Sequence, residues 1–443
     1  MFEKIWNTHI ITDLGGGSAL IAIDRIFLHE RTGAAALKSM AAAGRKVADS
    51  ARVFAVMDHI VDTRPGRGDS TLMPGGDAFI TETRAACAAA GITLFDVNDP
   101  DQGITHVISP ELGIVLPGCT LIAPDSHTCT QGAFGALAWG IGSSEAEHAM
   151  ATGTLRVVKP KTMRVVYDGQ LGAGVTAKDM ILRLIADHKS GGGKGHIVEF
   201  AGDAVRALDM EARMTLCNMA TEFSAMSGII APDDKSFGYL RGRRFAPDPL
   251  PDWADLLTDE GAIFDREIRI DANSIEPMVS WGTSPEQSIA ISDTVPRNAD
   301  ANALAYMGLA AGQRLAGLPI DVAFIGSCTN SRLSDLRRAA ALVNGKHKAS
   351  NVLALVVPGS SAVKRAAKAE GLDRIFTDAG FEWRESGCSL CFYSGGESFP
   401  QGSRVISSTN RNFEGRQGPG IRTHIASPEI VAASAIAGRI TAP

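Results

Sequence analysis

The sequence predicts an α/β fold built from several domains. Short runs of β-branched and other apolar residues end in polar, glycine-containing turns, and these runs alternate with alanine-rich amphipathic stretches, as strands alternate with helices. The chain has 443 residues, and domains of roughly 150 residues would give about three of them. Hydrophobic residues make up 45% of the chain and charged residues 21%, which excludes a disordered or collagen-like chain.

The first domain is expected at residues 1–160. Its short apolar runs predict buried strands, and several of these runs end at aspartate or histidine residues. A glycine-rich turn at 140–142 precedes Ser143 and Ser144, which is typical of a helix N-terminus. The expected strands of this domain span residues 53–57, 92–97, 105–108 and 120–123.

The second domain is expected at residues 161–276, and it begins with the strand and turn KTMRVVYDG. Helices are expected at residues 177–188 and 209–226, and the glycine-rich segment 190–195 is expected to be a flexible loop. The pattern is poorer over residues 229–300, where the proline-rich run APDPLP interrupts any helix or central strand. We expect a linker or a loosely ordered excursion there.

The third domain is expected at residues 277–443, and it has the clearest alternation of strands and helices. Its strands lead into loops rich in serine, asparagine and glycine. These loops carry no phosphate-binding loop, nucleophile elbow or dinucleotide-binding glycine pattern. The expected strands are residues 320–325, 351–357 and 404–408, and the expected helices are residues 335–343 and a helix that ends at Gly371.

Charge and hydropathy exclude several classes of protein. No apolar run approaches the ~18 residues of a membrane-spanning helix, and the start of the chain lacks the pattern of a signal peptide. There are 43 Lys and Arg residues against 49 Asp and Glu residues, a net charge of −6, which argues against nucleic acid and membranes as partners. The seven cysteines and the lack of a secretion signal indicate a reducing, cytoplasmic location.

Candidate functional residues follow the expected strands at their carboxyl ends. His59 follows one strand of the first domain, and Asp125 follows another. Cys328 and Asn410 follow two strands of the third domain. Loops at the carboxyl ends of the strands converge in open α/β sheets and bind ligands there. We therefore expect these residues to contribute to a functional site.

Three cysteines have a spacing that indicates metal or redox chemistry. Cys388 and Cys391 form a CxxC pair, and Cys328 lies upstream of it. Structural core cysteines, a thioredoxin-type pair and a zinc site are alternatives, but the loop-like residues before the pair and the lack of a nearby fourth ligand do not favour the last two. Three thiolates suit a cubane iron–sulfur cluster with one open iron. The remaining cysteines, Cys87, Cys119, Cys129 and Cys217, are expected to be buried apolar residues.

Carboxylates precede imidazoles at two places in the sequence. Asp58 precedes His59, and Asp125 and Ser126 precede His127. A neighbouring carboxylate fixes the tautomer of an imidazole and raises its pKa, as a proton donor requires. The alternative is a pair of turns in which Asp and His have only a structural role.

Two further pairs of polar residues are candidates for binding a substrate. Asn218 and Glu222 are four residues apart on an expected helix and therefore share a face. Arg411 and Arg416 flank a loop, and arginine binds carboxylates through two parallel hydrogen bonds. A solvated helix face and ordinary surface charge are the alternatives for these pairs.

Several motifs together resemble the aconitase superfamily. The motifs are SCTNSR at 327–332, GCSLC at 387–391, STNRNFEGRQG at 408–418 and DSHT at 125–128. Three longer segments are similar to the branch of 3-isopropylmalate dehydratase large subunits. They are QGITHVISPELG at 102–113, GAFGALAWGIGSSEAEH at 132–148 and MEARMTLCNMATE at 210–222. The resemblance spans essentially the whole chain.

The resemblance implies a three-domain α/β architecture around one 4Fe–4S cluster with three cysteine ligands and an open fourth iron. The implied ligands are Cys328, Cys388 and Cys391. The implied catalytic residues are Asp58, His59, His106, Asp125, Ser126, His127, Asn218 and Glu222. The implied substrate-binding residues are His29, Asn410, Arg411 and Arg416, and Asp24 and Arg25 match a further motif of the family near His29.

The resemblance also implies a reaction and a partner. The reaction is the isomerisation of 2-isopropylmalate to 3-isopropylmalate, in leucine biosynthesis, by loss and re-addition of water through a cis-alkene diacid. We find no segment like the swivelling fourth domain of aconitase, which carries the catalytic base. In the dehydratase branch a separate small subunit supplies that domain, so the chain is expected to need this partner.

The sequence departs from the family pattern at two places, so a substrate related to 2-isopropylmalate is an alternative. Ser386 and Leu390 replace the usual proline and methionine around the CxxC pair, and Phe392 and Tyr393 follow it. The segment 23–37 also departs from the usual pattern. A paralogue acting on another 2-alkylmalate, such as 2-methylmalate or 2,3-dimethylmalate, is therefore an alternative. An RNA-binding protein and a zinc or disulfide redox protein are alternatives of other classes, and the negative net charge argues against the first.

Overall fold

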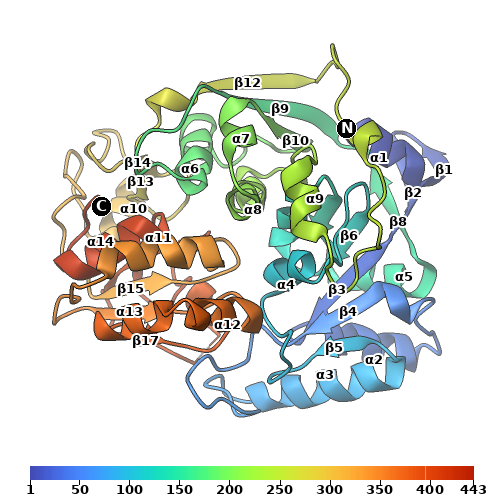
Figure 1. The fold of residues 1–443 in the computed structure, drawn as a ribbon, viewed down its shortest axis with the longest axis horizontal. Coiled ribbons are helices and arrows are strands. Elements are labelled where there is room, and N and C mark those ends of the chain that lie inside the picture. Colours follow the sequence, from blue (N-terminus) through green and yellow to red (C-terminus); the bar gives the residue numbers. More distant parts are fainter. Residues whose placement is uncertain (395) are drawn as a thin grey trace. The chain divides into compact units, whose positions relative to one another are not determined.

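The computed structural model describes residues 1–394 and 396–443, which fall into two compact units. The first unit comprises Met1–His59, Asp77–Gly169 and Gly193–Asp271. The second unit comprises Ile60–Gly76, Gln170–Gly192 and Ala272–Pro443. The division into three domains at residues 160 and 276 stays a prediction, although each of the three expected segments contributes a parallel sheet of its own (Figure 1).

A five-stranded parallel sheet forms one half of the first unit. Its strand order is β5-β4-β3-β6-β7, and each pair of neighbours runs parallel. The central strand β3 is not among the strands expected from the sequence. The strands are β3 (Arg25–His29), β4 (Val53–Val56), β5 (Thr93–Phe95), β6 (Thr120–Ala123) and β7 (Leu137–Gly140).

Two further sheets belong to the first unit. A parallel sheet has the order β11-β10-β9-β12, and an antiparallel sheet has the order β1-β2-β8. The strands of the parallel sheet are β9 (Lys161–Asp168), β10 (His196–Ala201), β11 (Ser227–Ile229) and β12 (Arg266–Asp271). Those of the antiparallel sheet are β1 (Ile10–Gly15), β2 (Ser18–Ala22) and β8 (Thr154–Val158).

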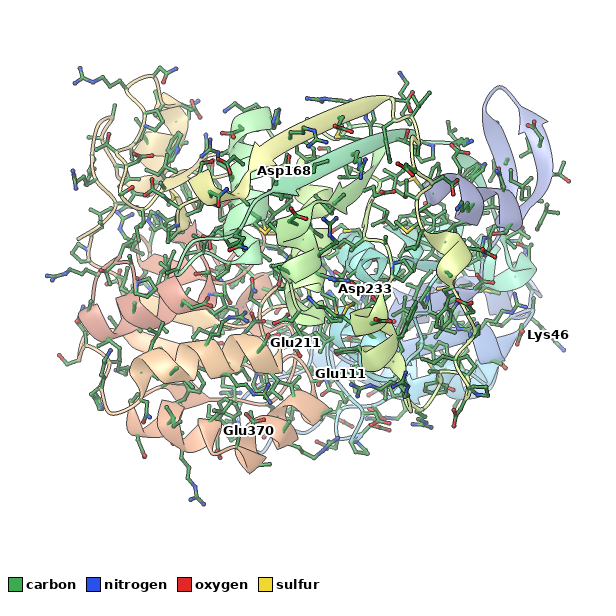
Figure 2. All side chains as sticks on the ribbon, turned by 45° about the horizontal axis from the view of Figure 1, so that its top comes forward. Lys46, Glu111, Asp168, Glu211, Asp233 and Glu370 are labelled. Carbon is green, nitrogen blue, oxygen red and sulfur yellow. The ribbon has the colours of Figure 1, made fainter. Side chains whose placement is uncertain are left out.

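Helices connect the strands of the first unit. They are α1 (Phe2–His9), α2 (Gly33–Ala42), α3 (Gly76–Ala90), α4 (Thr105–Glu111), α5 (Ser143–Thr152), α7 (Asp203–Ala207), α8 (Met210–Asn218) and α9 (Asp234–Leu240). Short 3₁₀ helices span Ser50–Arg52, Ser126–Phe134, Met219–Phe223 and Ala254–Leu256. The side chains of Lys46 and Asp168 are exposed at the surface of this unit (Figure 2).

The second unit contains the predicted C-terminal α/β segment. Its parallel sheet has the order β17-β16-β15-β18-β19, and β13 pairs with β14 in a separate antiparallel pair. The strands are β13 (Met278–Ser280), β14 (Ser288–Ala290), β15 (Val322–Ile325), β16 (Leu353–Val356), β17 (Glu382–Trp383), β18 (Arg404–Ser407) and β19 (Arg422–Ile425). The helices are α6 (Ala177–His188), α10 (Ala301–Met307), α11 (Leu333–Val343), α12 (Ser361–Ala369), α13 (Leu372–Asp378) and α14 (Pro428–Ala437), with 3₁₀ helices at Ala272–Ser274 and Ser389–Cys391.

The parallel sheets confirm the predicted α/β class, but one expected strand is wrong. Residues 105–108 form the first turn of helix α4. A short apolar run cannot be assigned to a strand or to a buried helix from periodicity alone. Here the carboxylate of Asp58 accepts hydrogen bonds from the amide and the hydroxyl of Thr105, at 3.0 and 3.2 Å. This contact caps the start of the helix, and it is made by a residue distant in sequence.

Two other expected segments differ in detail. The helix expected at 209–226 ends at Asn218, continues as the 3₁₀ helix Met219–Phe223, and stops at Ser224, whose φ is +63°. The segment expected to be loosely ordered contains α9 and strand β12. Strand β12 lies at the edge of its sheet and buries only alternate residues, so its sequence has no long apolar run.

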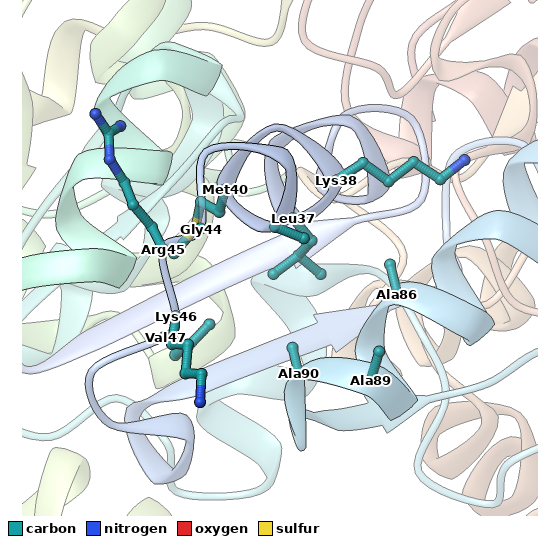
Figure 3. Close-up of a pocket in the computed structure, with 11 residues that line it drawn as sticks. Leu37, Lys38, Met40, Gly44, Arg45, Lys46, Val47, Ala86, Ala89 and Ala90 are labelled. Atoms are coloured by element: carbon teal, nitrogen blue, oxygen red, sulfur yellow. The ribbon is translucent and has the colours of Figure 1, made fainter.

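A hollow of about 570 Å³ lies between α2 and α3 in the first unit (Figure 3). Its lining consists mainly of the apolar side chains of Leu37, Met40, Ala86, Ala89 and Ala90, with lysine and arginine side chains at the rim. The predicted site residues belong to other elements. Across the described residues, 1–394 and 396–443, we find no helix with the length and apolar character needed to cross a bilayer.

Candidate active site

Acidic and imidazole side chains meet at the carboxyl edge of the five-stranded sheet of the first unit. Asp58 and His59 follow β4, and Asp125 follows β6 as the N-cap of the 3₁₀ helix Ser126–Phe134. His127 is on that 3₁₀ helix, and His106 is on α4. The structure thus brings together residues that the sequence placed after separate strands, as expected for parallel neighbours in one sheet.

Asp58 holds the ring of His59. The Nδ1 atom of His59 lies 2.5 Å from Oδ1 of Asp58, so Nδ1 donates a hydrogen bond to this carboxylate. Burial raises the pKa of the Asp58 carboxyl, but the positive charge and hydrogen bond of His59, together with smaller contributions, outweigh burial and leave the pKa below its usual value. Asp58 is therefore an ionised partner that fixes the orientation of the ring.

Asp125 contacts three histidines. Its Oδ2 lies 3.2 Å from Nε2 of His59, and its Oδ1 lies 3.1 Å from Nε2 of His106. Oδ1 also accepts a hydrogen bond of 2.7 Å from the amide of His127. Burial alone would raise the pKa of this carboxyl, but the charge of His106 and the hydrogen bonds from the three histidines hold it well below its usual range.

Glu222 and Asn218 have separate partners. Oε1 of Glu222 lies 2.8 Å from Nε2 of His127, and Oγ of Ser126 lies 3.4 Å from Nδ1 of the same ring. Asn218 is fully buried, and its amide donates to Oγ1 of Thr130 at 2.8 Å. A solvated helix face is therefore excluded for Asn218. Glu222 orients His127 directly, whereas Asn218 supports the 3₁₀ helix that carries His127.

His29 lies against His59. The two ring centroids are 4.2 Å apart with an angle of 27° between the planes, and Nε2 of His29 lies 3.1 Å from the carbonyl oxygen of Pro124. Burial and the charge of His59 lower the pKa of His29 to about 4, so its ring is neutral near pH 7. The carboxylate of Asp24, by contrast, contacts His9 and Thr120, and Arg25 donates to the carbonyl oxygen of Asp24.

The three predicted ligand cysteines lie in the second unit and are buried. Cys328 follows Ser327, whose φ of +78° turns the loop after β15, and Cys391 ends the 3₁₀ helix that begins after Cys388. Oγ of Ser327 donates to Sγ of Cys391 at 3.2 Å. Nδ2 of Asn410 donates to Sγ of Cys328 at 3.4 Å. Such donors stabilise thiolates, which is the form that binds metal.

The chemistry of the three cysteines fits an iron–sulfur cluster. All three side chains are buried, and Ser327 and Asn410 donate hydrogen bonds to two of the sulfur atoms. Cysteine thiolates are the ligands that hold iron–sulfur clusters. The assignment of these cysteines as cluster ligands stays a prediction.

Arg416 places a positive charge beside Cys391. Its Nη2 lies 3.6 Å from Sγ of Cys391. The guanidinium lies over the rings of Phe392 and Phe413, at 5.8 and 5.4 Å from their centroids. Arg411 is partly buried in the same loop. The two aromatic rings hold the guanidinium of Arg416 in place.

Lys178 is a buried residue that the sequence analysis did not single out. It is the second residue of α6, is fully buried, and donates to Oδ1 of Asn330 at 3.1 Å. It also donates to the carbonyl oxygens of Ser408 and Thr409, at 2.8 and 2.7 Å. Lys178 therefore ties the loop of Cys328 to the loop of Asn410. The sequence does contain one indication of this burial, because Lys178 lies in line with the apolar positions of an amphipathic helix.

The chain matches the aconitase family (aconitate hydratase) over residues 3–438. This match covers nearly the whole chain, so the chain belongs to the aconitase family and is a hydro-lyase. Aconitase-family proteins use a 4Fe–4S cluster.

Two individual proteins illustrate the similarity. The chain is 47% identical over 456 residues to "3-isopropylmalate dehydratase large subunit 1" of Bradyrhizobium diazoefficiens, and the alignment covers 99% of this chain and 95% of that protein. Among solved structures, the aconitase X of Thermococcus kodakaraensis in its holo-form aligns with a TM-score of 0.49 and 14% identity. That alignment covers 93% of this chain and 90% of the other.

Proposed function

We propose that this chain is the large subunit of a 3-isopropylmalate dehydratase. The reaction removes water from 2-isopropylmalate to give a cis-alkene diacid and adds water back to give 3-isopropylmalate. The similarity to a dehydratase large subunit along 99% of the chain supports the substrate. The single structural observation that carries the reaction class is the ring of His59, which lies within hydrogen-bond distance of two carboxylates.

His59 is the proposed general acid. Loss of the hydroxyl group requires a proton for the departing oxygen, and a positioned imidazole contributes about 10²–10⁴-fold to such a step. Asp58 holds Nδ1, so the proton is delivered from Nε2. Asp125, which lies 3.2 Å from Nε2, orients this nitrogen until the substrate arrives. His106 and His127 hold Asp125 in place from its other side.

Cys328, Cys388 and Cys391 are the proposed ligands of the cluster. When bound, a 4Fe–4S cluster with three protein ligands supplies a Lewis acid at its fourth iron. Ser327 and Asn410 stabilise the thiolates by hydrogen bonds. Arg416 and Arg411 are proposed to bind the carboxylates of the substrate, and Asn410 and His29 are proposed to contact the substrate as well.

A separate small subunit is the proposed partner. Removal of the proton next to a carboxylate requires a base, and we assign that role to none of the residues described above. The name of the Bradyrhizobium relative includes the words "large subunit", which supports a second polypeptide in the assembly. We propose that this polypeptide carries the base and shares in recognition of the alkyl group.

A related 2-alkylmalate is the second candidate substrate, and one observation favours it. Phe392, which departs from the family pattern, lies under the guanidinium of Arg416. A bulky ring beside a carboxylate-binding arginine would alter the space for the substrate's alkyl group.

A substrate panel tests the choice. The reconstituted complex is assayed with 2-isopropylmalate, 2-methylmalate and 2,3-dimethylmalate, and the proposal expects the highest kcat/KM for 2-isopropylmalate. A higher value for either of the smaller substrates would assign the chain to a paralogous dehydratase.

A further inference from the structure

Glu30 is a fully buried carboxylate at the carboxyl edge of the five-stranded sheet of the first unit. Glu30 is the residue directly after β3. Strand β3 pairs in parallel with β4 so that His29 is opposite Val56. Glu30 is therefore placed beside the turn that carries Asp58 and His59. The sequence analysis gave it no role.

The two oxygens of Glu30 accept hydrogen bonds from consecutive main-chain amides. Oε2 accepts from the amide of Asp58 at 3.1 Å, and Oε1 accepts from the amide of His59 at 2.7 Å. These amides lie beyond the end of β4, where the strand ladder no longer supplies acceptors. A buried amide without an acceptor is costly. The carboxylate supplies the two acceptors that a neighbouring strand would otherwise supply, and it does so through charge-assisted hydrogen bonds.

We propose that Glu30 is a positioning residue for His59. By fixing the main chain at Asp58 and His59, it sets the position from which the ring reaches Asp58 through Nδ1 and Asp125 through Nε2. The inference deepens the proposed function, because it rests on the assignment of His59 as the general acid. Glu30 itself acts through the main chain.

Both oxygens of the carboxylate are needed for this role. In a Glu30→Gln variant one oxygen becomes an NH2 group, which cannot accept a hydrogen bond. One of the two amides then loses its acceptor, and the turn shifts. The variant is expected to fold, because Gln102 holds the carbonyl oxygen of Met57 at 2.6 Å and Thr105 holds Asp58 independently of Glu30.

Kinetics of the assembled enzyme give the first test. Glu30→Gln should lower kcat about 10–100-fold, because small misplacements of a catalytic group have effects of this size, while KM stays within about twofold. The matched control is Glu145→Gln, whose carboxylate also accepts from a main-chain amide, that of Gly142 at 2.8 Å, but on the surface. The control should keep kcat unchanged. A Glu30→Gln variant with the kcat of the wild type would overturn the proposal.

An NMR measurement on the full chain gives a readout that does not depend on activity. Labelling with ¹⁵N-histidine gives at most ten main-chain signals, because the chain has 10 histidines, and His59→Ala assigns the one of interest. In the wild type the His59 amide should resonate downfield and exchange slowly with solvent. Glu30→Gln should move it upfield. If the variant does not fold, rapid exchange of the His59 amide in the wild type would still contradict the proposal.

The two tests separate this inference from the proposed function. If His59→Ala lowers kcat by about 10²–10⁴-fold and Glu30→Gln leaves both kcat and the His59 amide unchanged, Glu30 has no positioning role and the acid assignment stands. If the kcat of His59→Ala stays within about twofold of the wild type, the acid assignment fails, and with it the positioning role in catalysis.

Discussion

The Nε2 atom of His59 lies 3.2 Å from Oδ2 of Asp125, although the two residues follow different strands of one sheet. The opposite nitrogen of the same ring lies 2.5 Å from Asp58. Two ionised carboxylates on opposite sides of an imidazole hold its ring in a fixed orientation. This relationship gives the proposed proton donor a defined direction.

Replacement of His59 tests the role of this ring. His59→Ala should lower kcat by about 10²–10⁴-fold, the usual contribution of a general acid, because neither carboxylate can supply the proton at neutral pH. The visible absorption of the cluster should remain, since His59 is not among the proposed ligands. Turnover within about twofold of the wild type would remove His59 from the acid role.

Single cysteine replacements test the ligand assignment. Cys328→Ser, Cys388→Ser and Cys391→Ser should each abolish the visible absorption of the reconstituted chain, because a cubane cluster is held by thiolates. Cys87→Ser is the matched control, since Cys87 is equally buried, and it should keep the absorption. Retention of the cluster by all three of the first variants would show that the ligands lie elsewhere.

Lys178 is predicted to stabilise the loops around the cysteines. Lys178→Met leaves the side-chain oxygen of Asn330 and two carbonyl oxygens without their buried donor, which should lower the free energy of unfolding by about 3 kcal/mol. The measurement is urea-induced unfolding of the metal-free chain.

The matched control for Lys178 is Lys235→Met. Lys235 also donates to three carbonyl oxygens, at 2.7, 2.9 and 2.8 Å, but it is exposed. Water can replace its hydrogen bonds, so its loss should lower the free energy of unfolding by less than about 1 kcal/mol. Equal losses for the two variants would show that burial of Lys178 has no special effect.

The ion pair of His9 and Asp24 predicts a pH dependence of stability. Burial lowers the pKa of His9, but its hydrogen bonds and the charge of Asp24 raise it overall above 6.5. Burial raises the pKa of Asp24, but His9 and Thr120 lower it overall below 3.8. The His9 contribution is present below pH 6.5 and is lost as the pH rises through the higher folded pKa. The Asp24 contribution is present above pH 3.8 and is lost as the pH falls.

The pair should therefore stabilise the fold most between these two values. His9→Gln should lower the free energy of unfolding more at about pH 5.5 than at about pH 8.5. His148→Gln, a replacement of an exposed histidine, should show no such difference. Urea titrations at both pH values provide the comparison, and an equal loss at both values for His9→Gln would contradict the pairing.

The positions of several candidate site residues could be predicted because strand ends are visible in the sequence. His59 and Asp125 follow two strands of one sheet, and Cys328 and Asn410 follow two strands of another. Parallel strands gather the residues that follow them at one edge of their own sheet. The pattern does not reveal partners that are distant in sequence. His127 pairs with Glu222, and no spacing rule connects them.

The residues that were missed act through the main chain or from a helix. Glu30 lies after β3, a strand that the sequence did not indicate, so its contact with the next strand end was not foreseeable. Lys178 resembles an ordinary helix residue until its three acceptors are known. The short apolar run at the start of α4 predicts a strand, and the carboxylate that caps the helix, that of Asp58, comes from another part of the chain.

The need for a partner is predicted to be absolute. The purified, cluster-loaded chain should bind the substrate weakly and turn over none of it, because the base is proposed to lie on the small subunit. Addition of the small subunit should restore turnover. Full activity with a single polypeptide on a gel would place the base within these 443 residues.

The most direct measurement of the central claim is turnover of 2-isopropylmalate by the anaerobically reconstituted complex of this chain with its small subunit. The appearance of both the alkene diacid and 3-isopropylmalate is followed with and without prior removal of iron by a chelator. We predict that both products form in the loaded complex and that neither forms after iron removal. Undiminished formation of the products by the iron-free complex, or no formation by a complex with an intact cluster, would contradict the assignment of this chain as an iron–sulfur dehydratase subunit.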